Sequence, residues 1–569
     1  MNELSPQQTS RRQLGYALLL LSFYLLAYLL PLGARDLFLP DEPRYAEIPR
    51  EMITSGDWTV PHFNGVRYFE KPVLGYWVHA GSLLLFGENN FAVRFPSALA
   101  VGLSAILIFF LVRKARWDQQ KEDRQFAPYV AALIFLTSVE VFAVGNTAVL
   151  DSLFSFFLTA CIVAFYAATE TTPKSAKEKA WLLVAGLLCG LAFLTKGFLA
   201  FAVPILTLVP YLVWQRRFAD ILRLSWLPML AAVLVALPWA IRIHLREPDF
   251  WNYFFWYEHI HRFAASDAQH KQSFWFFLLT APPMVFPWTF LIPAAVVGIK
   301  KLWREQTTLS SPLKLCLCWL LLPLLLFSLS KGKLLTYILP CFPPFAMLMA
   351  AGLLRVLRGD GQSKLFQAGV AINGLLLALV TMAFVAVQLF AFRGFRPYSH
   401  TWQVVVIVVA LLFSLLCCWF SYGEKRAQAK IIFSGIALIS VYFSAHYLLP
   451  DLTTEVKCPG PILTKNSAGI MPDDIVIADA NSTGAACWYL KRDNIYGIKY
   501  AGELTYGFAY PDAAMRFLDL ESAKEFIERH RGKTIFVARV ETYQRWRDDL
   551  PPPLTYEQNG DKGYVVIRF

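Results

Sequence analysis

The sequence predicts an all-α polytopic membrane domain followed by a small C-terminal α/β domain. Of the 569 residues, 56% are hydrophobic and only 17% are charged, and the mean hydropathy is +0.44. A soluble domain has roughly a quarter of its residues charged, and one soluble core could not bury this much apolar surface. Thirteen apolar segments precede a polar tail. These observations exclude a water-soluble enzyme, a disordered chain and a small disulfide-rich fold.

The apolar segments define the helices expected in the membrane domain, residues 1–450. A transmembrane helix needs about 20 largely apolar residues. The predicted spans are 13–32, 93–113, 128–145, 150–169, 181–194, 198–214, 225–242, 275–298, 314–329, 337–357, 368–391, 402–420 and 431–449. The first follows Arg11 and Arg12 and lacks a small-residue cleavage site, which favours a retained span over a signal peptide.

Basic residues in the short connections predict the orientation of the spans. Alternate connections are rich in Lys and Arg, as in 113–124 and 216–223, whereas 145–150 has none. Cytoplasmic loops carry this excess, so the N-terminus is expected in the cytoplasm. Because thirteen is odd, the tail is expected on the other side, together with the long connections 33–92 and 243–274.

The tail, residues 451–569, is predicted to be an α/β domain. Its charge is nearly balanced, with 15 Lys and Arg against 17 Asp and Glu. Three apolar, β-branched runs predict strands: 474–478, 534–538 and 564–567. The segments 522–531 and 541–549 predict amphipathic helices. No catalytic set stands out in the tail, so a lid, an acceptor-docking surface and a stabilising module all stay open.

Charged and polar residues gather on the non-cytoplasmic side. The first long connection carries the runs Asp41-Glu42-Pro43-Arg44-Tyr45-Ala46-Glu47 and Tyr68-Phe69-Glu70-Lys71-Pro72. Further groups expected on this side are Asp151, Lys196, His259, Arg262, Lys331, Lys333 and Tyr337. Carboxylates at this boundary can orient or deprotonate an acceptor or hold a divalent cation, and Lys and Arg suit phosphate. Because no Walker, Rossmann or zinc motif is evident, a lipid-linked sugar phosphate fits better than a nucleotide.

Four stretches together resemble the lipid A aminoarabinose transferases: 41–47, 68–72, Glu258-His259 with Arg262-Phe263, and 330–333 with Tyr337. In their membrane domain these enzymes are similar to the dolichyl-phosphate-mannose-dependent protein mannosyltransferases. The resemblance covers nearly the whole chain and implies a GT-C glycosyltransferase. It implies transfer of 4-amino-4-deoxy-L-arabinose from undecaprenyl phosphate to a lipid A phosphate. It also implies the periplasmic face of a Gram-negative inner membrane and resistance to polymyxin and other cationic antimicrobial peptides.

The resemblance also implies roles for individual residues. Asp41 and Asp151 are the expected catalytic acids, which orient or activate the acceptor phosphate or stabilise positive charge on the sugar; each could instead cap a helix. The expected substrate contacts are Arg44, Tyr68, Lys71, Arg262, Lys331, Lys333 and Tyr337. Alternatively, the Lys71 side chain extends to the membrane surface without binding substrate. Glu70 and His259 are expected to hold a divalent metal ion of unknown identity, or the histidine is merely hydrogen-bonded.

Two other functions stay open on the residues alone. A related transferase with another acceptor, such as a protein or an envelope glycan, would share Asp41 and the basic phosphate contacts. A lipid-linked-sugar flippase would place paired ionisable residues near the bilayer midplane and show internal repeats, whereas the charges here cluster at one face. The expected partners are the lipid-linked donor, lipid A and the bilayer, and nucleic acid is not expected.

The nine cysteines fall into two groups. Seven lie in apolar segments, where they are expected to act as small hydrophobic residues. Cys458 and Cys487 lie in the tail. Because the periplasm is oxidising, these two are predicted to form a disulfide.

Overall fold

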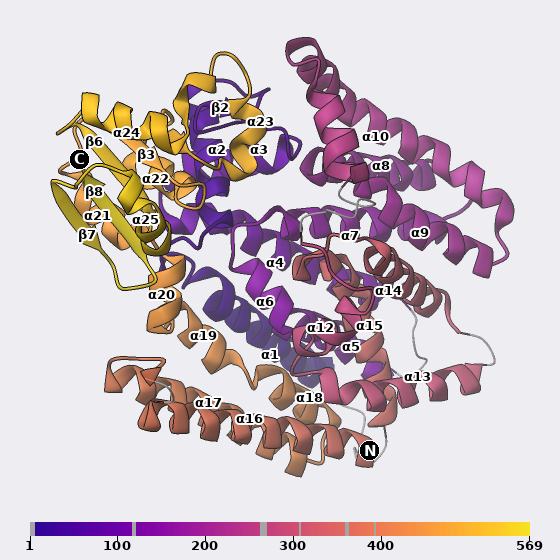
Figure 1. Ribbon diagram of the computed structural model, residues 1–569. Helices are drawn as coiled ribbons and strands as arrows, with labels where there is room; N and C mark the ends of the chain where they lie inside the picture. Colours follow the sequence, from indigo (N-terminus) through magenta and orange to yellow (C-terminus); the bar gives the residue numbers. More distant parts are fainter. Residues whose placement is uncertain (1–5, 116–120, 262–269, 307–308, 359–362, 392–393) are drawn as a thin grey trace.

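A helical bundle and a mixed β-sheet make up the structure (Figure 1). This computed structural model describes residues 6–115, 121–261, 270–306, 309–358, 363–391 and 394–569. The orange-to-yellow end of the chain forms the sheet, which lies beside α2 (Asp41–Ser55) at one end of the bundle. The predicted fold class, a helical membrane domain with a small C-terminal α/β domain, is confirmed.

Most helices of the bundle follow the predicted apolar segments, and the others lie in the two long connections, 33–92 and 243–274. Besides α2 they are α1 (Pro6–Tyr24), η1 (Leu25–Leu29), α3 (Leu74–Phe86), α4 (Asn90–Lys114), α5 (Lys121–Thr137), α6 (Val139–Gly145), α7 (Leu150–Thr169), α8 (Ala176–Lys196), α9 (Leu199–Trp214), α10 (Phe218–Arg246), η2 (Asn252–His261), α12 (Phe276–Met284), η3 (Thr289–Leu291), α13 (Ile292–Gln306), α14 (Ser311–Leu329), η4 (Leu335–Cys341), α15 (Phe342–Val356), α16 (Lys364–Phe390), α17 (Thr401–Gly423), α18 (Ala427–Ile436) and α19 (Ile439–Tyr447). Length and composition then decide which of them can cross a membrane.

Ten helical runs within the described residues are long and apolar enough to cross a membrane. Two bent pairs raise this number to twelve if each is one span: α5 with α6, bent by 67°, and α12 with the following helix, bent by 99°. The remaining predicted span, 198–214, corresponds to α9, which has only 16 residues and contains two prolines. Every one of the thirteen predicted segments therefore meets an apolar helix, although three of these helices are short or broken.

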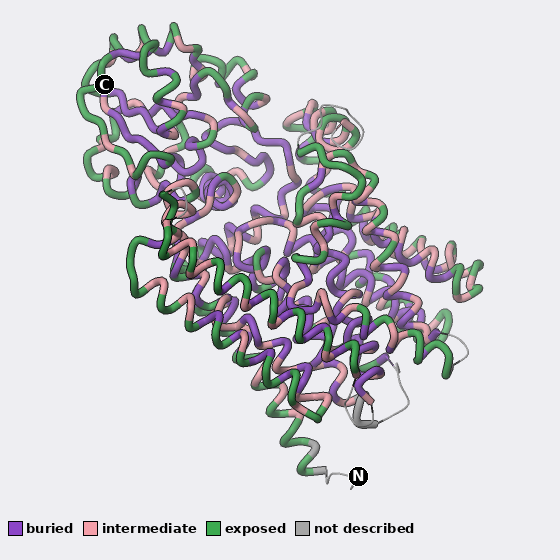
Figure 2. The backbone as a smooth tube through the Cα atoms, turned by 60° about the horizontal axis from the view of Figure 1, so that its bottom comes forward, coloured by how far each residue is buried: buried purple, intermediate pink, exposed green. Residues whose placement is uncertain are grey.

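Helix packing separates central from peripheral spans. In α7, 83% of the apolar stretch is buried, against 22% in α16, so the outer face of α16 is left for lipid. Figure 2 shows the same contrast between a buried interior and exposed outer helices. Small residues allow the closest approach: a Cβ on Gly298 of α13 would lie 1.8 Å from the carbonyl oxygen of Gly352 in α15. Such contacts are typical of membrane helices.

The long connection 33–92 is mostly regular structure. Besides α2 and α3 it contains a two-stranded ribbon of β1 (His62–Phe63) and β2 (Val66–Arg67). α2 reaches away from the bundle and packs against the C-terminal domain. The segment expected to carry most of the site acids is therefore a rigid element held between the two parts of the protein.

Six strands form the C-terminal sheet, in the order β5-β4-β3-β6-β8-β7. They are β3 (Ile475–Ala478), β4 (Tyr496–Ile498), β5 (Phe517–Leu518), β6 (Thr534–Arg539), β7 (Thr555–Gln558) and β8 (Tyr564–Arg568). The four strands from β5 to β6 are parallel, and β8 and β7 are antiparallel to their neighbours. The three predicted strands are β3, β6 and β8; β4 and β5 have only three and two residues, and the four residues of β7 are mostly polar and exposed.

Helices cover this sheet and connect its strands. They are α20 (Asp451–Lys457), α21 (Gly460–Ser467), α22 (Thr483–Leu490), η6 (Gly502–Leu504), α23 (Thr505–Phe508), η7 (Ala514–Arg516), α24 (Leu520–Arg529), α25 (Val540–Trp546) and η8 (Arg547–Asp549). The predicted helices 522–531 and 541–549 overlap α24 and α25. The segment between β4 and β5, which carries η6 and α23, lies against β2 of the long connection.

The predicted disulfide between Cys458 and Cys487 is absent. Both residues are free and buried. Cys458 directly follows α20, whereas Cys487 lies in α22 with its Sγ 3.5 Å from Asn64 Oδ1. The two cysteines therefore lie in different parts of the domain, and the predicted disulfide is wrong.

A buried ion cluster anchors the start of α2 to the bundle. The Glu42 carboxylate accepts hydrogen bonds from Arg35 (2.7 Å) and Arg94 (2.7 Å), and from the backbone N–H groups of Phe38 (2.7 Å) and Ala148 (3.0 Å). Burial favours the neutral acid, but the two guanidinium groups outweigh it and lower the pKa of Glu42 to about 2. Glu42 is therefore a structural residue that fixes the neighbouring Asp41.

Glu42→Gln should destabilise the protein, because an amide leaves two buried guanidinium groups without a counter-charge. We expect a loss of about 1–3 kcal/mol in unfolding free energy, seen as a lower melting temperature of the detergent-purified protein. The contribution of the wild-type carboxylate is present above its unfolded pKa and is lost as the pH falls toward 2. The matched variant Glu88→Gln removes an exposed partner of Lys491 and should leave melting nearly unchanged.

Candidate active site

The acid expected to be catalytic lies at the N-terminus of α2. Asp41 is the first residue of that helix, and its side chain is 44% exposed. Among the described residues, the hydrogen bond recorded for its carboxylate comes from the Arg44 guanidinium, three residues along the helix. Within the part of the chain that the structure describes, no backbone N–H donates to it, so the alternative role of Asp41 as a helix cap is not realised. The carboxylate is open to a substrate on one side and held by an arginine on the other.

Arg44 is the centre of a four-residue cluster. Its buried guanidinium donates to Asp41, to Glu503 and to the Tyr68 hydroxyl at 3.3 Å, and the Tyr68 hydroxyl donates to Glu503 at 3.1 Å. We call Asp41, Arg44, Tyr68 and Glu503 the Arg44 cluster. Burial acts to raise the pKa of Glu503, but Arg44 and Tyr68 hold it below its ordinary value. The cluster fixes the orientation of Asp41.

Glu503 was not predicted from the sequence. It lies in η6 of the C-terminal domain, 459 positions from Arg44 along the chain. Its surroundings in the sequence, Ala501-Gly502-Glu503-Leu504, have no distinguishing pattern. The C-terminal domain, in which no catalytic set stood out from the sequence, therefore supplies an acid that holds Arg44.

Lys71 is held between two acids beside this cluster. Its ammonium lies 2.8 Å from the Glu70 carbonyl oxygen, 3.2 Å from Glu258 Oε2 and 3.8 Å from Glu70 Oε2. Burial, together with the negative charges of Glu503 and Glu258, raises the pKa of Glu70 from 4.5 to about 7, although Lys71 opposes the shift. Glu70 can therefore be neutral or ionised under physiological conditions.

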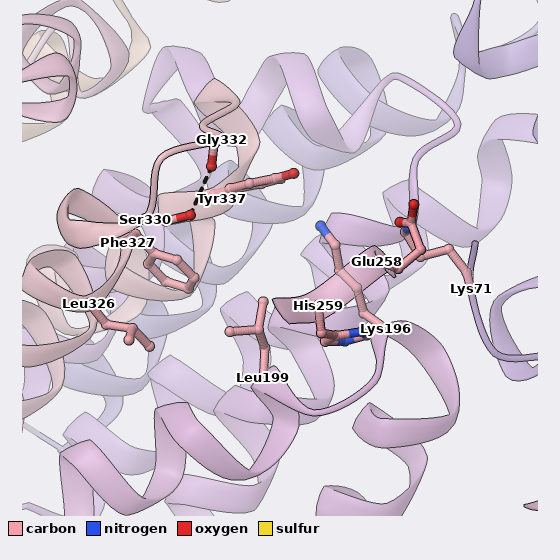
Figure 3. Close-up of a pocket in the computed structure, with 10 residues that line it drawn as sticks. All are labelled: Lys71, Lys196, Leu199, Glu258, His259, Leu326, Phe327, Ser330, Gly332 and Tyr337. Carbon is pink, nitrogen blue, oxygen red and sulfur yellow. Dashed lines mark hydrogen bonds and ion pairs between the residues drawn. The ribbon is translucent and has the colours of Figure 1, made fainter. Parts of the chain in front are cut away.

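A cavity opens next to Lys71 (Figure 3). We call it the lysine cavity; it has a volume of about 120 Å³ and is lined by Lys71, Lys196, Leu199, Glu258, His259, Leu326, Phe327, Ser330, Gly332 and Tyr337. In Figure 3, Lys71 and Glu258 lie on one side and Tyr337 on the other, with the Lys196 ammonium between them. Leu326, Phe327 and Leu199 form an apolar edge. The cavity is therefore lined both by two lysine ammonium groups and by an apolar surface.

Asp151 and Lys196 form an ion pair at this cavity. Asp151 is in the first turn of α7 and Lys196 is the last residue of α8, and the ammonium lies 2.5 Å from Asp151 Oδ1. The same ammonium is 4.8 Å from the centroid of the Tyr337 ring. The predicted residues Asp151 and Tyr337 are therefore brought together by a lysine that also lines the cavity.

Among the described residues, the predicted contacts Lys331 and Lys333 do not line the lysine cavity. Lys331 is exposed, and its backbone carbonyl accepts a hydrogen bond from Gln272. Lys333 is only 3% exposed, and its ammonium donates to the carbonyl oxygens of Gln272 and Ser330, so it stabilises its own turn instead of facing a phosphate. Burial lowers the pKa of Lys333. Arg262 lies outside the described residues.

The arrangement around His259 does not fit a metal ligand. Its Nδ1 lies 2.7 Å from the Phe254 carbonyl oxygen, and its Nε2 accepts a hydrogen bond from the Phe198 amide at 3.4 Å. Both ring nitrogens are thus engaged, which agrees with the hydrogen-bonded alternative. Among the described residues no group of three His, Cys, Asp or Glu side chains converges as a cation site. The metal held by Glu70 and His259 stays a prediction.

Comparisons with known proteins give the family. The family model for dolichyl-phosphate-mannose-protein mannosyltransferases matches residues 14–254, and the model for the C-terminal domain of arabinosyl transferase ArnT matches residues 454–567. An undecaprenyl phosphate-α-4-amino-4-deoxy-L-arabinose arabinosyl transferase of Aeromonas hydrophila is 41% identical over 510 residues, which cover 90% of this chain and 91% of the relative. The chain belongs to this arabinosyl transferase family.

Further relatives of the arabinosyl transferase family agree over nearly the full length. The protein with the same name from Erwinia tasmaniensis is 39% identical over 566 residues and covers 97% of this chain and 98% of its own. The crystal structure of ArnT from Cupriavidus metallidurans bound to undecaprenyl phosphate aligns with a TM-score of 0.78 and 21% identity, over 97% of this chain and 98% of that one. The protein is a multi-pass membrane glycosyltransferase with the arabinosyl transferase fold.

Proposed function

We propose that the protein transfers 4-amino-4-deoxy-L-arabinose from undecaprenyl phosphate to a phosphate of lipid A at the periplasmic face of the inner membrane. The names of its relatives support the sugar and the lipid carrier. The lysine cavity supports the site, because Lys71 and Lys196, the last residue of a candidate span, meet an apolar edge there. This juxtaposition suits a phosphate attached to a prenyl chain and is the observation that carries the proposal.

The proposed reaction exchanges one phosphate for another at the sugar. An oxygen of the acceptor phosphate bonds to the anomeric carbon while the bond from that carbon to the undecaprenyl phosphate oxygen breaks. The leaving group departs as a phosphate anion and the acceptor is already ionised at neutral pH, so strong base catalysis is not required. The main tasks of the enzyme are to align the two phosphates and to balance their charge.

Each part of the site has a proposed role in this reaction. Lys71, Lys196 and Tyr337 bind the donor phosphate, with Lys71 exchanging its contact with Glu258 for a phosphate oxygen. Asp151 holds the Lys196 ammonium in place. Asp41 stabilises the positive charge that grows on the sugar ring, and Arg44 is a positioning residue that acts through it.

The proposed topology places both substrates on one side of the membrane. The positive-inside pattern supports a cytoplasmic N-terminus and a periplasmic C-terminal domain, with residues 1–450 as the membrane domain and 451–569 as the periplasmic domain. The transferred amine offsets negative charge on lipid A. Because lipid A then carries less negative charge, it attracts cationic peptides such as polymyxin more weakly.

Transfer by the purified protein tests the proposal. Detergent-solubilised protein is incubated with undecaprenyl-linked aminoarabinose and lipid A. The products are separated, and their masses are measured by mass spectrometry. We expect lipid A to gain one aminoarabinose unit and free undecaprenyl phosphate to accumulate. A protein or envelope-glycan acceptor that is modified while lipid A is not would support the alternative acceptor. If no glycosidic bond forms in detergent but the protein, reconstituted in vesicles, moves the donor between leaflets, a flippase is supported instead.

Glu70 should make donor binding depend on pH. Its pKa of about 7 means that it is neutral at pH 6 and ionised at pH 8, where its charge competes with the donor phosphate for Lys71. Because the donor phosphodiester does not titrate in this range, we expect its apparent affinity to be roughly three- to tenfold weaker at pH 8 than at pH 6. Michaelis constants for the donor, measured at pH 6 and at pH 8, give this difference.

The variant Glu70→Gln is the control for this pH dependence. An amide cannot ionise, so the difference between pH 6 and pH 8 should disappear. The same raised pKa means that stability falls as the pH rises from about 4.5 to about 7, because the unfolded chain releases this proton earlier than the folded one. An unchanged pH dependence in Glu70→Gln would show that another group is responsible.

A further inference from the structure

A second, larger cavity lies at the opposite ends of the helices that form the candidate active site. α7 begins beside that site and ends at Thr169, α8 begins at Ala176 and ends beside it, and α14 begins at Ser311 and ends beside it. The second cavity is lined by the far ends of these three helices and by the end of α4, and its volume is about 870 Å³. A 20-residue helix is about 30 Å long, so the two cavities lie on opposite sides of the bundle. We call the second one the far-side cavity.

The far-side cavity has apolar walls and a charged rim. Leu111, Val163 and Leu188 line it from candidate membrane spans. Lys114 is the last residue of α4 and Lys177 lies in the first turn of α8, and both are exposed at the rim. The cavity therefore has an apolar interior, and two cations lie at its rim, where the helices end. This arrangement suits an amphipathic anion.

Backbone groups at the rim favour the same kind of ligand. Both α8 and α14 begin at the far-side cavity, and helix N-termini carry partial positive charge that attracts anions. Within the described residues, the buried Ser310 Oγ before α14 has no hydrogen-bond partner. A phosphate or glycerol oxygen could satisfy this hydroxyl. The acid at the rim, Glu170, accepts a hydrogen bond from Ser311 at 3.4 Å.

We infer that the far-side cavity binds one anionic glycerophospholipid of the adjacent leaflet. The lipid phosphate would lie between Lys114 and Lys177, near Ser310, and the acyl chains would lie along the apolar walls. The Trp181 ring, whose centroid is 5.6 Å from the Lys114 ammonium, places an aromatic group at the same level. A sugar donor bound here would be about 30 Å from the candidate active site, so this is a separate lipid site.

Native mass spectrometry of the full-length protein in mild detergent tests the inference. Phosphatidylglycerol, phosphatidylcholine and undecaprenyl phosphate are added separately at equal concentrations, and the lipid-bound fraction is measured. We expect phosphatidylglycerol to bind more tightly than phosphatidylcholine, while undecaprenyl phosphate also binds at the lysine cavity. The double variant Lys114→Ala/Lys177→Ala should weaken its binding roughly tenfold or more, because each lysine near a lipid phosphate contributes appreciably. If the double variant weakens undecaprenyl phosphate binding as much as phosphatidylglycerol binding, or leaves phosphatidylglycerol binding unchanged, the inference is overturned.

Two further variants separate this site from general charge and from misfolding. Arg113→Ala/Lys179→Ala removes two cations that lie beside Lys114 and Lys177 but do not line the cavity, and it should leave phosphatidylglycerol binding unchanged. Ala167→Trp fills the cavity from α7 and should remove the bound lipid without removing any charge. Equal losses in the two double variants, or full lipid binding by Ala167→Trp, would overturn the inference. Sugar transfer in detergent should be unchanged in all three variants.

Discussion

Asp41→Asn is expected to lower the rate of sugar transfer by about a hundred- to a thousandfold, the usual effect of removing one preorganised electrostatic contact to a transition state. The carboxylate of Asp41 is half exposed at the start of α2 and is held by Arg44. Asparagine has nearly the same shape, so substrates should still bind. The loss should therefore appear in kcat with little change in KM for either lipid.

The structure offers a matched control for this variant. Asp519 begins a helix in the C-terminal domain, and its carboxylate accepts a hydrogen bond from the Ser522 amide at 2.7 Å. Asp519→Asn makes the same chemical change at another helix start and should leave transfer unchanged. Both proteins should melt near the wild-type temperature, since Glu42 and Glu503 still anchor α2. Near wild-type transfer by Asp41→Asn would leave Asp41 a merely structural residue and remove the main support for this active site.

Local patterns in the sequence were sufficient to predict the bundle and half of the sheet. The thirteen apolar segments correspond to helices because hydropathy over 20 residues is a local property. Strands β3, β6 and β8 carry apolar runs of at least four residues, whereas β4 and β5 have three and two residues and depend on their neighbours in the sheet. Helix α3 was missed because its 13 residues are fewer than a span needs.

Most of the residues that were predicted for the site belong to continuous motifs. Asp41, Arg44, Tyr68 and Lys71 come from two such motifs, and the structure brings them together. Glu503 reaches Arg44 from a separate domain, and no local pattern encodes a contact across 459 positions. Lys333 shows a second limit: the sequence does not reveal that its ammonium donates to the carbonyl oxygens of Gln272 and Ser330.

The second large effect is a weaker binding of the sugar donor when Lys71 is replaced. Lys71→Ala should raise the Michaelis constant for undecaprenyl-linked aminoarabinose by roughly 10- to 100-fold, because a hydrogen bond to a charged group contributes about 1.5–3 kcal/mol. Its ammonium lines the lysine cavity and contacts only oxygen atoms of Glu70 and Glu258 among the described residues, so a donor phosphate can replace one of these contacts. Lys71→Arg keeps the charge and should recover part of the affinity.

Lys331→Ala is the matched control for Lys71→Ala, since both lysines were predicted from the sequence to bind phosphate. Lys331 is exposed and does not line the lysine cavity, so its removal should change the Michaelis constant for the donor less than about threefold, within the range of surface electrostatics. Saturation curves for donor and acceptor, measured for both variants, distinguish a lost donor contact from a general loss of positive charge. If both variants weaken donor binding equally, the basic side of the protein attracts the donor without a specific phosphate site, and the proposed role of the lysine cavity is wrong.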